Sequence, residues 1–205
     1  FFNNWTGWSV IGGYIPRRFE AAGCEREDAI RDFVFVYGAM GLLTLVSISL
    51  ADRVGRRPLW MFASVLAALI TLLCGFVFAW GWKGTPVVIV IALITLPHGL
   101  ALGGLPWLMM SELFPTRLRA KAVAVTTTVL WIFIFTGAYL FPSISRWSEE
   151  AVGSVAAAFW LFTGVCILSF FFGWLVMPET KGRTLEDIGE SWNAGADRRL
   201  RDGSR

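Results

Sequence analysis

Charged side chains gather at a few points of an otherwise apolar sequence. The stretch "ADRVGRRP", residues 51–58, places four charges within six positions, between two long uncharged runs. They are Asp52, Arg53, Arg56 and Arg57. Further charges follow later apolar runs, at Glu112, Arg117 and Glu179. Carboxylate and guanidinium groups form charge-assisted, often bidentate hydrogen bonds, so the chemistry that these residue types favour is ion pairing.

Catalytic chemistry is not indicated by the residue types present. The chain has one histidine, His98, and its carboxylates are scattered among loops, so no Ser-His-Asp, Cys-His or metal-ligand cluster can be assembled. Three widely separated cysteines, Cys24, Cys74 and Cys166, do not suggest a disulfide framework. We therefore expect a protein that is not an enzyme and that holds no metal and no cofactor.

Membrane-spanning helices are the elements that must position these charges. The chain is 56% hydrophobic and 16% charged, against roughly 25% charged in a soluble domain. Apolar runs that reach the ~18–25 residues needed to cross a bilayer cover residues 33–51, 59–82, 84–111, 122–145 and 151–179. A shorter run, residues 1–16, is predicted to be a sixth helix whose beginning or upstream partner is missing. The expected fold is an all-α membrane protein, a six-transmembrane-helix bundle.

The basic residues indicate how the bundle lies in the membrane. Of the 18 Lys and Arg residues, 12 fall in residues 53–57, in residues 117–121 or after residue 180. By the positive-inside rule these segments are cytoplasmic, which places both termini there. Because these basic residues set the orientation of the bundle in the membrane, the net charge of +3 does not require a nucleic-acid partner. We expect a multi-pass integral protein of the lipid bilayer, in the plasma (inner) membrane, with an organelle membrane as the alternative.

The fourth span is unusual because "LPHGLALGGLPW", residues 96–107, combines two prolines with three glycines. Such breaks are tolerated at membrane depth where protein or a watery cavity satisfies the freed backbone groups. The span is therefore predicted either to bend beside a cavity or to be a kinked packing helix. His98 lies at this depth and is a candidate for proton coupling. A neutral histidine bonded to a neighbouring helix is the alternative.

The end of the chain is predicted to leave the membrane. Pro178 ends the last predicted span, and "TLED", residues 184–187, has the form of a capping box. We expect the transmembrane bundle over residues 1–178, a cytoplasmic capping helix over residues 179–192 and a disordered cytoplasmic tail over residues 193–205.

Three motifs occur in order on the predicted cytoplasmic side: "DRVGRRP" at 52–58, "PWLMMSELFPTRLRAKA" at 106–122 and "PETKGRTLEDI" at 178–188. Together they resemble the C-terminal half of the sugar porter family within the major facilitator superfamily. This resemblance implies a bundle equivalent to transmembrane helices 7 to 12, paired with a homologous N-terminal six-helix half in the same or a separate chain. It also implies transport by alternating access, in which the two halves rock about a central site.

The resemblance further implies that the cytoplasmic charges form a gate. In the family, residues at these positions build an ion-pair network that closes the cytoplasmic side. Here the network would comprise Asp52, Arg53, Arg56, Arg57, Glu112, Arg117 and Glu179. Exposed ion pairs are worth only about 0–1 kcal/mol each, which suits a latch that breaks in every cycle. A solvated cluster that only sets topology is the alternative.

A substrate site is implied by the same resemblance. The family's paired glutamines, glycine, asparagine and tyrosines before a proline correspond to "NNWTGWSVIGGYIP", residues 3–16. The implied substrate-binding residues are Asn3, Asn4, Ser9, Tyr14, Trp107 and Trp131. Other positions depart from the family pattern, since Met40 and Leu130 stand where sugar carriers hold an asparagine and Gly99 stands where some hold a glutamate.

These departures bear on the expected solute. A buried polar group left without a partner costs about 1–3 kcal/mol, so the losses at Met40, Gly99 and Leu130 predict weakened sugar binding. We expect a secondary transporter of a small polar solute, such as an organic acid or a sugar derivative, with or without H⁺. The alternative is a non-transporting membrane subunit that acts as a scaffold or sensor in a larger complex.

Overall fold

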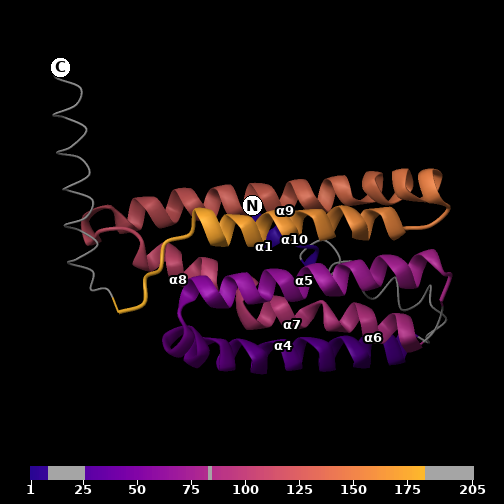
Figure 1. Ribbon diagram of the computed structural model, residues 1–205, viewed down its shortest axis with the longest axis horizontal. Coiled ribbons are helices and arrows are strands. Elements are labelled where there is room, and N and C mark those ends of the chain that lie inside the picture. Colours follow the sequence, from indigo (N-terminus) through magenta and orange to yellow (C-terminus); the bar gives the residue numbers. More distant parts are fainter. Residues whose placement is uncertain (9–25, 83–84, 183–205) are drawn as a thin grey trace, which may run out of the picture.

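The computed structural model describes residues 1–8, 26–82 and 85–182. Every element in these residues is helical, and the long helices run side by side along one axis (Figure 1). The long helices are α4 (Arg26–Val54), α5 (Arg56–Ala79), α9 (Thr116–Val152) and α10 (Ala156–Leu175). The shorter ones are α1 (Phe2–Trp5), α6 (Thr85–Leu93), α7 (Thr95–Pro97), the π-helical turn η1 (His98–Leu102) and α8 (Leu105–Glu112).

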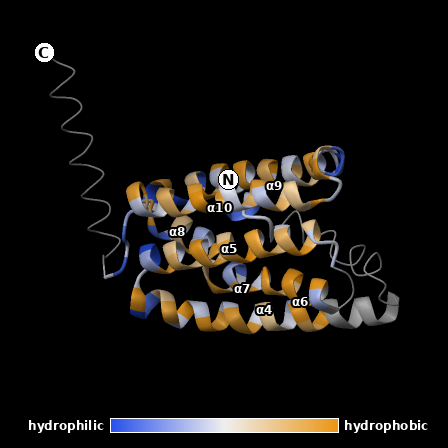
Figure 2. Ribbon diagram, turned by 45° about the vertical axis from the view of Figure 1, so that its right-hand side comes forward, coloured by the Kyte–Doolittle hydropathy of each residue, from blue (hydrophilic) through white to orange (hydrophobic). Residues whose placement is uncertain are grey.

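The all-α membrane fold is confirmed. Five stretches are long and apolar enough to cross a membrane: Val34–Val54, Arg56–Ala79, Ile89–Glu112, Thr116–Val152 and Ala156–Leu175. Figure 2 shows apolar residues along these helices and hydrophilic residues at their ends. The first predicted span, residues 1–16, is described only as far as residue 8, and there it contains α1. In Figure 1 the first residue lies part-way along the bundle, beside α10.

The structure corrects the predicted limits of the last two spans. Helix α9 extends beyond residues 122–145 at both ends, because charged residues limit the lipid-buried length of a helix without ending the helix. It stops at Gly153, whose φ of 70° forms a left-handed C-cap. Helix α10 therefore begins at residue 156 and ends at residue 175, before Pro178. Residues 179–182 are not helical, and the remainder of the predicted capping helix and the tail lie outside the described residues.

Helices α5 and α10 pack closely through small polar residues. The hydroxyls of Ser64 and Ser169 lie 3.0 Å apart. About two helical turns further along α5, the hydroxyls of Thr71 and Thr163 also lie 3.0 Å apart. In lipid such interhelical hydrogen bonds and small side chains replace the hydrophobic effect as the source of helix association. The two hydroxyl pairs thus fix the register of α5 against α10.

Two tryptophans flank these hydroxyl pairs, and each lies on a glycine of the opposite helix. The Trp60 indole of α5 covers Gly173, where an added Cβ would lie 2.7 Å from Cδ1 of the ring. The Trp160 indole of α10 covers Gly75 in the same way. Without glycine at these two positions, the helices could not approach so closely. The broken fourth span packs against α5 of this pair and against α4.

The fourth span is bent, as the sequence predicts. It runs through α6, α7, η1 and α8, with a turn at Gly103 and Gly104 between η1 and α8. The π-helical turn, in which bonds join residues five apart, is a rare feature that often marks functional sites. Figure 1 places the end of α8 at the same end of the bundle as the α4–α5 turn and the segment that follows α10. The predicted gating charges lie at this end.

Candidate functional site

The carboxylate of Glu179 caps the start of α5. Its Oε1 accepts the backbone N–H of Arg56 at 3.0 Å, and its Oε2 accepts that of Arg57 at 3.1 Å. The first N–H groups of a helix lack partners within the helix, and the helix dipole favours negative charge there. Gly55 precedes the helix with a φ of 109°. A Cβ at residue 55 would lie 2.7 Å from Oε2 of Glu179, so glycine allows the carboxylate to approach.

The side chain of Arg56 joins α5 to α8. Its Nη2 lies 2.8 Å from Oε1 of Glu112 and its Nε donates to Oε2 at 3.3 Å, a bidentate pair. The same Nη2 lies 3.0 Å from Oδ1 of Asp52, and Nη1 donates to the Ala51 carbonyl at 3.0 Å. Glu112 also accepts a 2.7 Å hydrogen bond from the hydroxyl of Thr180. Arg56 is only 9% exposed, so these partners replace the water that would otherwise solvate its positive charge.

Two further cations cap helix C-termini. Arg57 donates to the carbonyl of Gly173 at 3.1 Å and to that of Trp174, at the end of α10. Lys181 donates to the carbonyl of Arg53 at 2.5 Å, at the end of α4. The last carbonyls of a helix lack partners and lie at the negative end of the dipole, so both contacts are favourable. One cluster of charges therefore joins the ends of α4, α5, α8 and α10.

The structure brings together most of the predicted gating residues. This charged cluster consists of Asp52, Arg56, Arg57, Glu112, Glu179 and Lys181. The side chains of Arg53 and Arg117 are exposed and bond to no other described residue, so neither joins the charged cluster. Sequence reasoning missed Lys181, although it lies within the third motif.

Sequence reasoning also missed Arg119. Its Nε and Nη2 are buried and have no partner among the described residues. The sequence feature that could have indicated Arg119 is its place in the second motif, two residues after Arg117. These two nitrogens are donors that a group outside the described residues can satisfy.

Acid is expected to weaken the charged cluster at Glu179. Burial disfavours the charged form, but hydrogen bonds from the backbone N–H groups of Lys181, Arg56 and Arg57 outweigh it and hold the pKa of this carboxyl below its ordinary value. A lowered pKa stabilises the folded state above the unfolded-state pKa, and this stabilisation is lost as the pH falls through the folded-state pKa. The unfolding temperature should be higher for the wild type than for Glu179→Gln near neutral pH, and the difference should shrink as the pH falls below the ordinary glutamate value of 4.5. A difference that does not change with pH would contradict this role.

Asn3 and Asn4, predicted to bind substrate, direct their amides to backbone carbonyls. Asn3 Nδ2 donates to Leu102 at 2.5 Å and lies 3.3 Å from the Gly103 carbonyl. Asn4 Nδ2 donates to Leu130 of α9 at 3.4 Å. Both asparagines are buried, at 9% and 1% exposure. Their amides therefore tie α1 to η1 and to α9.

The predicted substrate tryptophans have a different environment. Trp107 of α8 is 46% exposed and Trp131 of α9 is 59% exposed, although both follow residues that are more deeply buried. Ser9 and Tyr14 lie outside the described residues. Gly99 and Met40 are two of the positions where the sequence departs from the family pattern. Gly99 faces α4, and a Cβ there would lie 3.1 Å from the Met40 carbonyl oxygen. These two positions therefore pack against each other.

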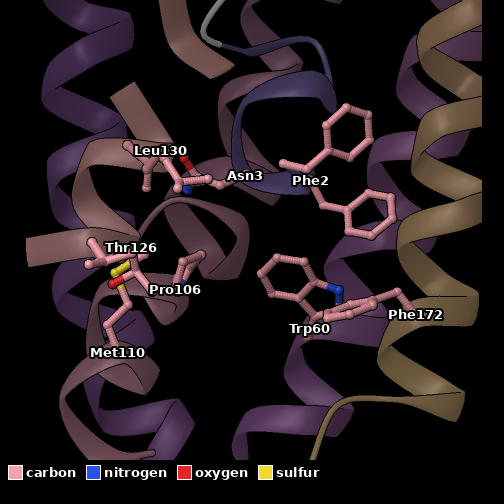
Figure 3. Close-up of a pocket in the computed structure, with 11 residues that line it drawn as sticks. Phe2, Asn3, Trp60, Pro106, Met110, Thr126, Leu130 and Phe172 are labelled. Atoms are coloured by element: carbon pink, nitrogen blue, oxygen red, sulfur yellow. The ribbon is translucent and has the colours of Figure 1, made fainter. Parts of the chain in front are cut away.

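A pocket of about 290 Å³ opens beside Asn3 (Figure 3). Most of its lining is apolar, and it includes Phe2, Trp60, Pro106, Met110, Leu130 and Phe172. Asn3 and Thr126 are the polar residues in its lining, and the Thr126 hydroxyl bonds within its own helix. Neither predicted substrate tryptophan lines it. The described lining of this pocket supplies few of the hydrogen-bonding groups that a polyol needs.

His98 is buried in the bent span at 8% exposure. Its ring lies 5.4 Å from that of Trp8, centroid to centroid. Its Nδ1 is buried without a hydrogen-bond partner among the described residues. A ring nitrogen of this kind at membrane depth can accept a proton or a polar group of a solute, so proton coupling through His98 stays a prediction.

The sequence of this chain matches a protein-family model and several curated proteins. A family model described as "Sugar (and other) transporter" matches residues 1–192. "Sugar transporter ERD6-like 1" of Arabidopsis thaliana is 33% identical over 192 residues, which cover 90% of this chain and 39% of that protein. "Facilitated trehalose transporter Tret1" of Drosophila yakuba is 32% identical over 202 residues, which cover 92% of this chain and 22% of that protein. The chain thus spans less than half the length of these relatives.

The fold is similar to that of a solved transporter. The chain matches the proton:xylose symporter XylE, a major facilitator superfamily protein bound to 6-bromo-6-deoxy-D-glucose, with a TM-score of 0.83 and 25% identity. The match covers 93% of this chain and 40% of XylE.

Proposed function

Because this chain belongs to the sugar transporter family of the major facilitator superfamily, we propose that it forms one half of a carrier that moves a sugar across a membrane by alternating access. The other half is a second six-helix bundle, in the same chain or a separate one. The relatives are transporters rather than enzymes, and the proposal needs no cofactor. Both termini of the complete bundle lie in the cytoplasm, and the membrane is the plasma (inner) membrane or that of an organelle.

The charged cluster is the observation that carries this proposal. It holds the ends of four helices through contacts that are each weak and partly exposed, with the exception of the buried Arg56. Such contacts can form and break with little energy, which a gate requires and a permanent structural core does not. In the proposed cycle the charged cluster is closed while the sugar enters from the opposite side, and it opens to release the sugar into the cytoplasm.

The exposed tryptophans support the proposed substrate site. Trp107 and Trp131 lie on adjacent elements, α8 and α9, and each leaves about half of its side chain uncovered. Indole rings stack against the apolar faces of sugar rings while their N–H groups bond to hydroxyls, which makes them suitable ligands for a sugar held between two bundles. Ser9 and Tyr14 complete the proposed lining from the first span, while the amides of Asn3 and Asn4 support it through their bonds to backbone carbonyls.

Uptake by the complete protein tests the proposal. Reconstituted into vesicles with its flanking sequence, the wild type should take up at least one of D-glucose, D-xylose and trehalose. Trp107→Ala should reduce this uptake about tenfold or more, because a stacked ring contact and its buried area are lost. Trp147→Ala, a change to another exposed tryptophan far along α9, should leave it unchanged. Proton coupling through His98 predicts that His98→Gln removes any dependence of uptake on pH.

Failure of this test would take a definite form. If the reconstituted wild type takes up none of the three sugars nor a small organic acid, the carrier function is wrong. The scaffold or sensor alternative would then be favoured. Equal losses from Trp107→Ala and Trp147→Ala would leave transport standing but would remove Trp107 from the substrate site.

A further inference from the structure

The break in the fourth span leaves two carbonyls without their usual donors. In an α-helix the carbonyl of residue 102 accepts the N–H of residue 106, but residue 106 is Pro106, which has no N–H. The carbonyl of Gly103 would accept the N–H of Trp107, which instead donates to Gly104 at 3.1 Å. A carbonyl buried at membrane depth without a partner is costly. The break therefore needs a donor from another element.

Asn3 supplies this donor. Its Nδ2 lies 2.5 Å from the Leu102 carbonyl oxygen and 3.3 Å from that of Gly103, so one amide group reaches both orphaned acceptors. Leu102 is 1% exposed, so Asn3 and its neighbours shield this carbonyl from solvent. Figure 3 shows Asn3 and Pro106 at the same pocket. The amide of α1 does what the missing N–H of Pro106 cannot do.

We propose that Asn3 is a positioning residue that fixes the angle between η1 and α8 and thereby places Trp107, the residue directly after Pro106. This inference rests on the proposed substrate site, because its consequence for uptake acts through Trp107. It gives Asn3 a role different from the direct contact with solute that the sequence pattern implies. This positioning role follows from the bonds of the Asn3 amide to the carbonyls of Leu102 and Gly103.

The pocket beside Asn3 makes the angle of α8 sensitive to this contact. Pro106 and Met110 of α8 line this 290 Å³ of open space, and Figure 3 shows Trp60 and Phe172 on its other side. Close packing normally holds a helix in place, and here one side of α8 lacks it. Loss of the Asn3 hydrogen bonds therefore leaves α8 free to shift into the pocket, which moves Trp107 with it.

A double substitution tests the inference in the complete carrier. Asn3→Ala should raise KM about tenfold for whichever of D-glucose, D-xylose and trehalose the carrier takes up fastest, with the maximal rate per folded protein within about twofold of wild type. Pro106→Ala restores an N–H that can donate to the Leu102 carbonyl. The double variant Asn3→Ala/Pro106→Ala should therefore recover a KM close to that of Pro106→Ala alone. A loss of folded protein alone would lower the total uptake and leave both KM and the maximal rate per folded protein unchanged.

Thermal unfolding without sugar separates this inference from the proposed function. Asn3→Ala should lower the unfolding temperature of the purified carrier by about 4 °C, and adding Pro106→Ala should restore most of it. Thr95→Ala is the matched control, because its hydroxyl bonds to the Ala92 carbonyl of the same span at 2.8 Å. Pro106→Ala should not rescue that variant. If Asn3→Ala does not fold, Asn3→Ser, whose shorter side chain cannot reach the carbonyl, replaces it.

The outcomes are distinct. Additive effects of Asn3→Ala and Pro106→Ala on both KM and the unfolding temperature would overturn the inference. A thermal rescue without any uptake by the wild type would support the hydrogen-bond replacement and remove the carrier function. A thermal rescue with a KM that does not recover would restrict Asn3 to stability and overturn its positioning of Trp107.

Discussion

Replacing Gly55 by alanine is expected to lower the free energy of unfolding by about 3 kcal/mol. The backbone at Gly55 has a φ of 109° and a ψ of 159°, a region open almost only to glycine, and another residue there costs about 1–3 kcal/mol. The new Cβ would also lie 2.7 Å from Oε2 of Glu179. The carboxylate must then withdraw from the backbone N–H groups of Arg56 and Arg57, each worth about 1 kcal/mol.

A matched substitution separates the two causes. Gly153 also has a positive φ, of 70°, but a Cβ there would meet no atom within 4 Å. Gly153→Ala should therefore cost only the left-handed backbone, about 1 kcal/mol. Chemical unfolding of the purified protein in detergent micelles measures both variants. Equal losses would mean that the approach of Glu179 to α5 contributes nothing to stability.

Replacing Gly173 by leucine is expected to have a similarly large effect, about 3 kcal/mol of destabilisation. Gly173 lies beneath the Trp60 indole, and Trp60 is itself 5% exposed and donates from Nε1 to the Ser169 carbonyl at 3.1 Å. The indole cannot move aside without losing this bond and opening the α5–α10 contact. The Arg57 side chain, which caps the Gly173 carbonyl, would be displaced as well.

The same helix offers the control for this substitution. Gly164 of α10 has no atom within 4 Å of an added Cβ, so Gly164→Leu should be neutral or slightly stabilising, since leucine favours a helix more than glycine does. Both variants are compared by unfolding in the same micelles. If Gly164→Leu is as harmful as Gly173→Leu, the cost comes from the helix itself and the Trp60–Gly173 contact is not responsible.

Composition predicts the spans of this fold well but not the rotation of each helix about its axis. A run of about 20 apolar residues has one plausible place in a membrane protein, so all five spans could be located, although the limits of the last two were wrong by up to seven residues. The partners on each helix depend on rotation, and two residues along a helix turn the side chain by about 200°. For this reason the choice of Arg117 missed Arg119, two of whose guanidinium nitrogens are buried. It is also why Asn3 could be recognised as a polar residue while its carbonyl acceptors could not.

Helix ends posed a second difficulty. The sequence predicts that Glu179 carries a charge near other charges, and the natural interpretation is an ion pair between side chains. Its partners in the structure are backbone N–H groups of α5, which have no signature in the sequence beyond the start of a helix. The same holds for Lys181 and the carbonyl of Arg53. Contacts to main-chain atoms depend on where a helix ends, and that boundary is the least certain part of a sequence-based prediction.

The segment that follows α10 has a consequence for how the protein is made. Residues 179–181 supply the carboxylate that caps α5, the hydroxyl that bonds to Glu112 and the ammonium that caps α4. During synthesis the chain leaves the ribosome from its N-terminal side, so α4 and α5 enter the membrane long before these residues exist. The first N–H groups of α5 and the Arg53 carbonyl of α4 therefore lack these partners until residue 181 has left the ribosome. The emergence of residues 179–181, rather than the insertion of α4 and α5, completes this end of the bundle.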